Sequence, residues 1–163
     1  MKNWFKENWR ILCAIFLVLV FLGAIGVKNR SHSPASSTNC SINYRLDTVV
    51  KVNEHVLNAE NAVTPQQRAT GLSGRECIGQ NQAMLFIFQQ PGYYSFWMKG
   101  MKFPIDIVWI GSDHKTVDVI RNVKPSTYPY SFANKGQQAL YVMELAASRS
   151  KSLGINPGTS INF

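Results

Sequence analysis

Two acidic residues occur where a charged side chain is unexpected, each inside a strongly apolar segment. Asp106 stands in IDIVWI, and Glu144 stands in YVMELAA. Because a bare charge in an apolar interior costs far too much free energy, each carboxylate must be ion-paired, hydrogen-bonded or protonated. Carboxylates perturbed in this way are typical of acid–base or ligand-binding sites, although structural ion pairs perturb them too. Asp106 and Glu144 are therefore the first candidate site residues.

The expected partners of these carboxylates are Arg68, Arg75 and Lys99. Arg68 and Arg75 are seven residues apart, which places them near one face of a helix if the helix continues that far. One interpretation is an ion-pair network that fixes how a short helix and the loop at Lys99 dock on the domain. The other is a polar pocket that binds a ligand or performs acid–base chemistry. Trp97 lies beside this predicted cluster, although an aromatic residue in a strand more often belongs to the core.

A second candidate site is the aromatic segment 125–132, PSTYPYSF. It contains Tyr128, Tyr130 and Phe132 among serine, threonine and proline residues, which is typical of an exposed loop. Exposed aromatic rings stack on sugars or on extended peptides. This loop is therefore a candidate binding surface, although such loops also occur without a binding role.

The cysteines suggest a disulfide but no metal site. Outside the apolar run described below, the chain contains Cys40 and Cys77, which could pair in an oxidising compartment. Two unpaired thiols are the alternative, because Cys40 lies in a segment predicted to be flexible. The sequence has no CxxC, zinc-spaced Cys/His, HExxH, G-x-S-x-G or nucleotide-binding glycine motif. We therefore predict no metal and no cofactor.

Residues 11–27 (ILCAIFLVLVFLGAIGV) form an apolar run without a charged side chain. A helix of this run would be roughly 25 Å long, slightly shorter than a hydrocarbon core of about 30 Å. We predict a single-pass anchor that inserts into the lipid bilayer, with residues 1–10 as a short cytoplasmic tail. A cleaved signal peptide is the alternative, because basic residues precede the run and Ala24-Ile25-Gly26 resembles a cleavage site. The rest of the chain then lies outside the cytoplasm, either at the cell membrane or secreted.

The segment after the run and the charge of the chain restrict the expected partners. Residues 28–43 are rich in Ser, Asn and Pro and are predicted to be a flexible linker. The formal net charge is +8, and residues 31–163 account for +4 with 12 basic and 8 acidic residues. This modest excess suits anionic lipids or acidic envelope polymers. It lacks the clustered basic stripe expected of a protein that binds nucleic acid.

Residues 44–163 are predicted to form one mainly β domain with short helices (α+β), either a small barrel or a sandwich. A helix is expected from Thr64, because Thr64 can cap it, Pro65 suits its first position and Gln67 completes a capping box. Gly71 should end that helix, and another helical turn is expected at 148–153. The expected strands lie at 47–57, 83–88, 93–98, 105–110, 116–123, 139–147 and 159–163.

Residues 63–163 resemble the family called domain of unknown function 192. The resemblance is carried, in order, by TPQQR (64–68), GL (71–72) with Arg75, MLFIF (84–88), FWMK (96–99), PID (104–106) and YVMEL (141–145). It implies a compact β-barrel-like fold, often exported or membrane-attached, and brings no established activity. The chain departs from the family where Gly100-Met101 replaces the more frequent Asn-Thr, and where Ala147-Ser148 replaces the usual Ala-Gly.

The leading functional hypothesis is a non-enzymatic, membrane-anchored, extracytoplasmic module that binds a cell-envelope polymer or a partner protein. The alternative is an envelope-acting hydrolase with Asp106 and Glu144 as acid and base, which requires both carboxyl groups in one cleft. A third hypothesis is an assembly role in which the domain folds only against a partner.

Overall fold

The computed structural model describes Cys40 and residues 44–163. The predicted cytoplasmic tail, the predicted membrane span at 11–27 and nearly all of the predicted linker lie outside the described residues. Within the described residues, no helix combines the length and the apolar character needed to cross a membrane.

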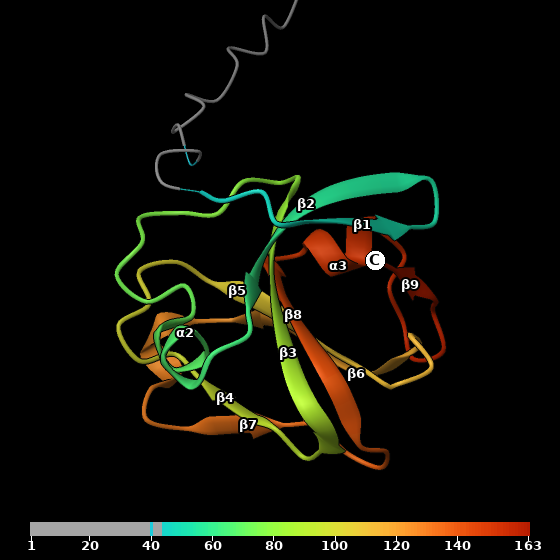
Figure 1. Ribbon diagram of the computed structural model, residues 1–163. Coiled ribbons are helices and arrows are strands. Elements are labelled where there is room, and N and C mark those ends of the chain that lie inside the picture. Colours follow the sequence, from blue (N-terminus) through green and yellow to red (C-terminus); the bar gives the residue numbers. More distant parts are fainter. Residues whose placement is uncertain (1–39, 41–43) are drawn as a thin grey trace, which may run out of the picture. The chain divides into compact units, whose positions relative to one another are not determined.

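This part of the chain is mainly β, with a few short helices and a strongly curled sheet (Figure 1). The strands are β1 (Thr48–Val52), β2 (His55–Ala62), β3 (Gln82–Gly92), β4 (Ser95–Trp97), β5 (Ile105–Ile110), β6 (Thr116–Val123), β7 (Ser131–Ala133), β8 (Ala139–Ala146) and β9 (Ile161–Asn162). The helices are α2 (Pro65–Thr70), the 3₁₀ turn η1 (Pro125–Thr127) and α3 (Arg149–Ser152). The mainly β fold with short helices agrees with the prediction from sequence.

Seven strands form one sheet in the order β6-β5-β8-β3-β2-β1-β9, and β4 pairs with β7 in a separate two-stranded sheet. β2 and β3 are parallel, and α2 lies in the connection between them. The other neighbouring strands of the large sheet are antiparallel. An isolated antiparallel bridge between Lys115 and Ser160 joins the segments just before the two edge strands, so the sheet curls back toward itself.

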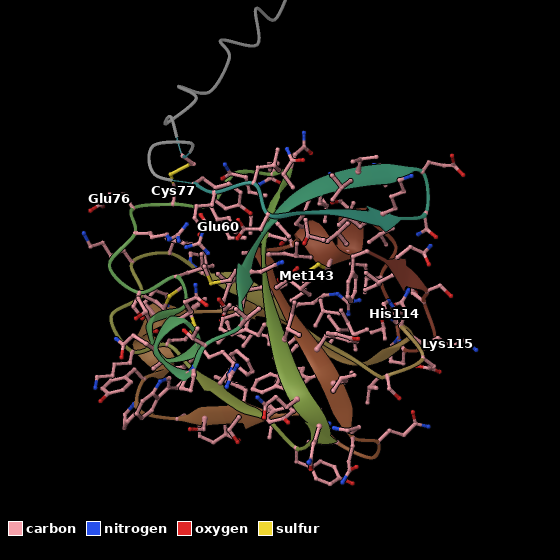
Figure 2. All side chains as sticks on the ribbon, in the orientation of Figure 1. Glu60, Glu76, Cys77, His114, Lys115 and Met143 are labelled. Atoms are coloured by element: carbon pink, nitrogen blue, oxygen red, sulfur yellow. A yellow bond between two sulfur atoms is a disulfide. The ribbon has the colours of Figure 1, made fainter. Side chains whose placement is uncertain are left out.

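The two faces of the curled sheet pack into separate cores. The inner core collects side chains from β1, β2, β3, β5, β8 and β9, and its residue Met143 lies near the middle of the domain (Figure 2). The outer core covers β3, β5 and β8, where Phe86 and Trp109 pack with Leu72, Phe96 and Phe132 from the segments around α2, β4 and β7. In Figure 1, α2, β4 and β7 gather on one side of the paired strands β3 and β8.

The continuous apolar runs of the sequence account for the central strands. Every residue of β5 is buried, and residues 83–86 of β3 are buried as well. Alternate side chains of a strand point to opposite faces, so a strand between two cores must be apolar at nearly every position. The prediction of strands buried on both faces is confirmed for β5 and for the first half of β3.

The start of α2 follows the capping signals of the sequence. The Thr64 side chain accepts a hydrogen bond from the backbone N–H of Gln67, and the Gln67 side chain accepts one from the backbone N–H of Thr64. Pro65 occupies the first turn, where its missing N–H costs nothing. Gly71 ends the helix with φ +50° and ψ −134°, a conformation that residues with a Cβ rarely adopt. The predicted helix and its end are confirmed.

The structure differs from the sequence prediction around the aromatic segments. The strand expected at 93–98 is only the three-residue β4, and it pairs with β7, which lies partly within the loop expected at 125–132. Phe96 is opposite Phe132 in this pair, and both pack against the outer core. Pairing between two such short, distant segments leaves no local pattern in the sequence from which it could be predicted.

Candidate functional site

Asp106 is a buried carboxylate with a full set of hydrogen-bond donors. Its Oδ1 accepts from the backbone N–H of Asn122 at 2.8 Å and of Ser148 at 3.0 Å. Its Oδ2 accepts from the backbone N–H of Ser150 at 2.9 Å and from the Ser150 hydroxyl at 2.6 Å. Asp106 therefore holds the end of β6 and the start of α3 against β5, which is a structural role. The basic residues expected as its partners, Arg68, Arg75 and Lys99, are not among its hydrogen-bond donors.

Asp106 and Glu144 lie on opposite faces of the sheet. In the register of β5 with β8, Asp106 is opposite Leu145, whereas Glu144 is opposite Ile107. Leu145 belongs to the inner core and Ile107 to the outer core, so the two carboxyl groups point to different sides. The hypothesis of a hydrolase that uses them as an acid–base pair in one cleft is therefore wrong.

Glu144 is buried without a hydrogen-bond partner for one of its oxygens. The residue is 5 % exposed, and its Oε2 is buried and makes no hydrogen bond to the described residues. Burial raises the pKa of Glu144 to about 8, and the nearby charge of Arg75 lowers it by a smaller amount. At neutral pH the side chain is therefore mainly a neutral carboxylic acid, which has an O–H to donate.

Arg75 pairs with Glu60, a residue that the sequence prediction missed. Its Nη1 and Nη2 donate to Oε1 and Oε2 of Glu60, both at 2.8 Å, in a bidentate ion pair. Burial by itself would raise the pKa of Glu60, but the hydrogen bonds and charge of Arg75 and the backbone N–H of Arg45 lower it overall. The ring of Tyr44 lies 5.9 Å from the Arg75 guanidinium. The parallel pairing of β2 with β3 brings this pair close to Glu144, and no local sequence pattern shows that pairing.

Arg68 lies in an aromatic setting rather than beside a carboxylate. Its Nη1 donates to the carbonyl oxygen of Ile87 at 3.1 Å and to that of Val63. Its guanidinium lies 5.1 Å from the centroid of the Phe88 ring, and Phe88 stacks on Tyr94. Among the described residues, no carboxylate forms an ion pair with Arg68. The charge of Arg68 is therefore not neutralised by an ion pair in this part of the chain.

Arg68, Glu144 and these aromatic rings line one cleft of about 370 Å³. The cleft is also lined by Ala69, Thr70, Gly71, Leu72, Ser73, Phe86, Ser95, Phe96, Trp97 and Met101. A smaller hollow of about 190 Å³ beside Arg75 and Glu60 shares Thr70 and Gly71 with it. The cleft thus combines aromatic walls with a few polar groups, which is the usual composition of a small-molecule site.

Exposed aromatic rings form the rim of this cleft. Trp97 lines the cleft and is 50 % exposed, so the expectation that it belongs to the core is wrong. The Tyr128 ring lies 5.7 Å from the Trp97 ring, and the Lys99 Nζ lies 5.5 Å from it. Tyr130 is 65 % exposed and packs edge-on against Phe132. We call Trp97 and Tyr128, whose rings contact each other, the aromatic rim.

The predicted cluster is therefore only partly assembled. Arg68, Trp97 and Glu144 line the cleft, Lys99 lies at its rim and Arg75 borders it, whereas Asp106 lies on the other face of the sheet. The described residues contain no group of three or more His, Cys, Asp or Glu side chains that could hold a metal ion.

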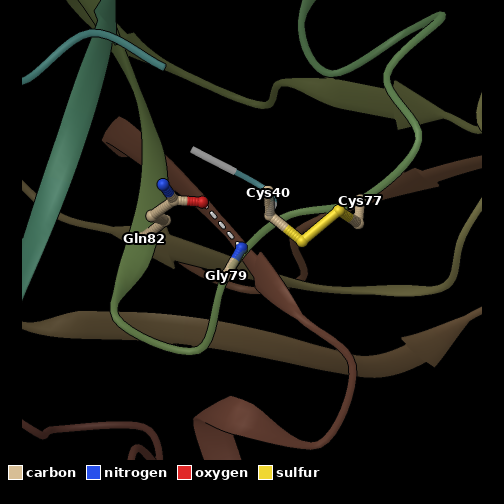
Figure 3. The surroundings of a disulfide bond; sticks show 4 residues. All are labelled: Cys40, Cys77, Gly79 and Gln82. Carbon is tan, nitrogen blue, oxygen red and sulfur yellow. Dashed lines mark hydrogen bonds between the residues drawn. A yellow bond between two sulfur atoms is a disulfide. The ribbon is translucent and has the colours of Figure 1, made fainter. Parts of the chain in front are cut away.

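Cys40 and Cys77 are joined by a disulfide (Figure 3). Their Cα atoms are 5.5 Å apart, and the bond closes a loop over a sequence separation of 37. Just after Cys77, the Gly79 backbone N–H donates to the Gln82 side chain at 2.7 Å, which orders the entry into β3. A disulfide over a loop of this length stabilises the folded state by about 3–4 kcal/mol in the chain-entropy model.

Residues 48–163 match the model of a known protein family, DUF192, which is described as "Uncharacterized ACR". The chain belongs to the domain of unknown function 192 family. Solved structures similar to this DUF192 domain include two with sequence identities of 28% and 30%. One is a protein of unknown function from Novosphingobium aromaticivorans DSM 12444, with a TM-score of 0.66, 28% identity and coverage of 71% of this chain and 84% of that one.

A second of these structures comes from Sinorhizobium meliloti 1021 and is described as a "putative transcription regulator". It has a TM-score of 0.64, 30% identity and coverage of 70% of this chain and 89% of that one. Among curated proteins, no match to the chain is found.

Proposed function

We propose that the protein is a membrane-tethered binding module on the outer side of the cell membrane, whose cleft binds a sugar unit of an envelope glycan. The observation that carries the proposal is the cleft of about 370 Å³ with aromatic walls and an aromatic rim. Its volume lies within the range of about 300–1,000 Å³ that is usual for small-ligand sites. No described acid–base pair shares this cleft, so a binding role is favoured over a hydrolytic one.

The chemistry of the walls supports a sugar as the ligand. Aromatic faces bury the apolar C–H face of a pyranose ring, while the hydroxyl groups of the sugar need polar partners at the edge. Trp97 presents a half-exposed ring, and the Arg68 guanidinium and the side chains of Thr70 and Ser73 also line the cleft. The positive charges of Arg68 and Lys99 add attraction for the acidic polymers of a cell envelope.

Two features support a location outside the cytoplasm. The apolar run 11–27 is long enough to enter a bilayer when flanked by its tryptophan and basic residues. The Cys40–Cys77 disulfide suits an oxidising compartment, because such bonds are rare in the cytosol of most organisms. The linker at 28–43 would then hold the domain close to the envelope polymers.

The proposal is tested by measuring glycan binding to the full-length chain in detergent micelles. The variant Trp97→Ala should weaken binding about 30-fold, corresponding to about 2 kcal/mol, because an aromatic anchor usually contributes at least that much. Tyr93→Ala is the matched control, since Tyr93 is 58 % exposed but does not line the cleft. Equal loss in both variants, or no binding of any envelope saccharide by the unmodified protein, would overturn the proposal.

A further inference from the structure

One residue that lines the cleft has a buried side-chain oxygen without a hydrogen-bond partner. Glu144 lines the cleft, yet its Oε2 is buried and makes no hydrogen bond to the described residues. A buried polar group without a partner usually costs about 1–3 kcal/mol, so such groups occur mainly where a ligand or water completes them. The position of Glu144 therefore points to a ligand atom that bonds to its carboxyl group.

Gly71 lines the cleft close to this carboxyl group. A Cβ at position 71 would lie 3.8 Å from the Glu144 Oε2 and 3.3 Å from the Phe86 ring. Gly71 lines both the cleft and the smaller hollow, and its backbone conformation disfavours any other residue. A side chain at position 71 would therefore crowd the Phe86 ring and the Glu144 carboxyl group at the wall of the cleft.

Several charged and titratable groups lie around Glu144. Arg68 from α2 and Tyr94 from the segment before β4 line the same cleft, and Arg75 from the loop after α2 acts on Glu144 through its charge. Arg75 is itself held by Glu60 from β2, with Tyr44 beside it. The neighbours of Glu144 in the sheet register, Met84 on β3 and Ile107 on β5, do not titrate.

We infer that the Glu144 carboxylic acid donates a hydrogen bond to a carbonyl oxygen on the bound sugar, supplied by an N-acyl or a carboxyl substituent. This inference rests on the proposed function and specifies which sugars the cleft selects. A carboxylic acid offers one O–H donor, and a carbonyl oxygen is a strong acceptor that Arg68 can reach from the same cleft. A sugar without this substituent leaves the acid unpaired and binds more weakly.

The inference has a defined pH dependence. Burial holds the pKa of Glu144 at about 8, so the acid is protonated below that pH and becomes a carboxylate above it. A carboxylate cannot donate and repels the carbonyl oxygen. Affinity should therefore be constant at low pH and fall about tenfold per pH unit once the pH exceeds the pKa, because binding then requires uptake of a proton.

The test uses two saccharides that share one backbone. Chitotetraose carries an N-acetyl group on each ring, and cellotetraose has a hydroxyl group in its place. Calorimetric titration of the full-length chain in detergent micelles at pH 6 should give at least tenfold tighter binding of chitotetraose, and this preference should disappear by pH 10. In a second arm, tetragalacturonate, which carries carboxyl groups, replaces chitotetraose. Tighter binding of tetragalacturonate than of cellotetraose would identify a carboxyl group as the source of the carbonyl oxygen.

Substitutions at Glu144 separate the hydrogen bond from the rest of the cleft. Glu144→Gln keeps a donor of the same size but cannot titrate, so it should retain the preference and lose its pH dependence. Glu144→Leu removes the donor and should bind the substituted and unsubstituted saccharides equally. Glu76→Gln is the control, because Glu76 pairs with Lys102 on the surface and should leave the pH profile unchanged.

Different binding results would overturn this inference and the proposed function. If the substituted and unsubstituted saccharides bind equally at every pH, the inference is overturned while glycan binding stands. A preference that persists in Glu144→Leu would also overturn it. If no saccharide binds at any pH, both proposals fall together.

Discussion

Two carboxyl groups on neighbouring strands illustrate how burial alone does not decide a side chain's role. Asp106 on β5 and Glu144 on β8 are both buried in apolar surroundings. Asp106 accepts four hydrogen bonds, which satisfy both of its oxygens and fix the surrounding backbone. Glu144 has an oxygen without a partner and a raised pKa, and it lies against an open cleft. The count of donors around each group, rather than its burial, separates the structural residue from the candidate binding residue.

The structural role of Asp106 predicts a loss of stability without a loss of binding. Asp106→Asn replaces one acceptor oxygen by an NH₂ group, which faces N–H or O–H donors and leaves them unpaired. We expect the free energy of unfolding to fall by about 3 kcal/mol. Urea unfolding measures this change, with Glu54→Gln at an exposed position as a control expected to change stability by less than about 0.5 kcal/mol.

Binding measurements complete this test, because Asp106 lies on the opposite face of the sheet from the cleft. The folded Asp106→Asn variant should bind the same saccharides with unchanged affinity. Unchanged stability together with lost binding would contradict the structural role.

At the level of the elements, local signals were enough to predict α2 and the central strands. The capping box at Thr64 depends on hydrogen bonds between residues only a few positions apart. The apolar runs at 83–88 and 105–110 indicate strands that are buried on both faces. The site was harder to predict, since the pairing of Arg75 with Glu60 depends on how β2 and β3 lie together. The same limit explains why β7 and the opposite directions of Asp106 and Glu144 could not be predicted: strand register is a long-range property.

The entry into α3 contains a strained position that a glycine should relieve. Ser148 precedes α3 with φ +67°, and its side chain makes no capping hydrogen bond. Its backbone N–H donates to Asp106, a contact that glycine retains. Because left-handed backbone costs a non-glycine residue about 1 kcal/mol, Ser148→Gly should stabilise the domain by about that amount.

Thermal unfolding measures the effect as a rise in Tm of a few degrees. Ser152→Gly is the matched control, because Ser152 lies within α3 and glycine in a helix should lower stability instead. A loss of stability in Ser148→Gly would show that the serine side chain contributes more than its backbone conformation costs.

At the level of the whole molecule, one loop connects the disulfide with the cleft. The segment between α2 and β3 contains Gly71 beside the Glu144 carboxyl group, Arg75 in its ion pair with Glu60, and Cys77 in its disulfide with Cys40. Fixing Cys77 restricts how far this segment can move away from the sheet. The disulfide therefore stabilises the wall of the proposed binding site as well as the fold.

The central claim is that Glu144 is a neutral acid available to a ligand in the cleft, and carbon NMR of its side-chain carboxyl group tests this most directly. The unmodified protein, selectively labelled with ¹³C at glutamate and assigned by comparison with Glu144→Gln, should show a carboxyl titration with a midpoint near pH 8. Saturating chitotetraose should move that midpoint higher, because the ligand binds the protonated form. A midpoint near the ordinary glutamate value of 4.5, unchanged by any of the saccharides, would contradict the account.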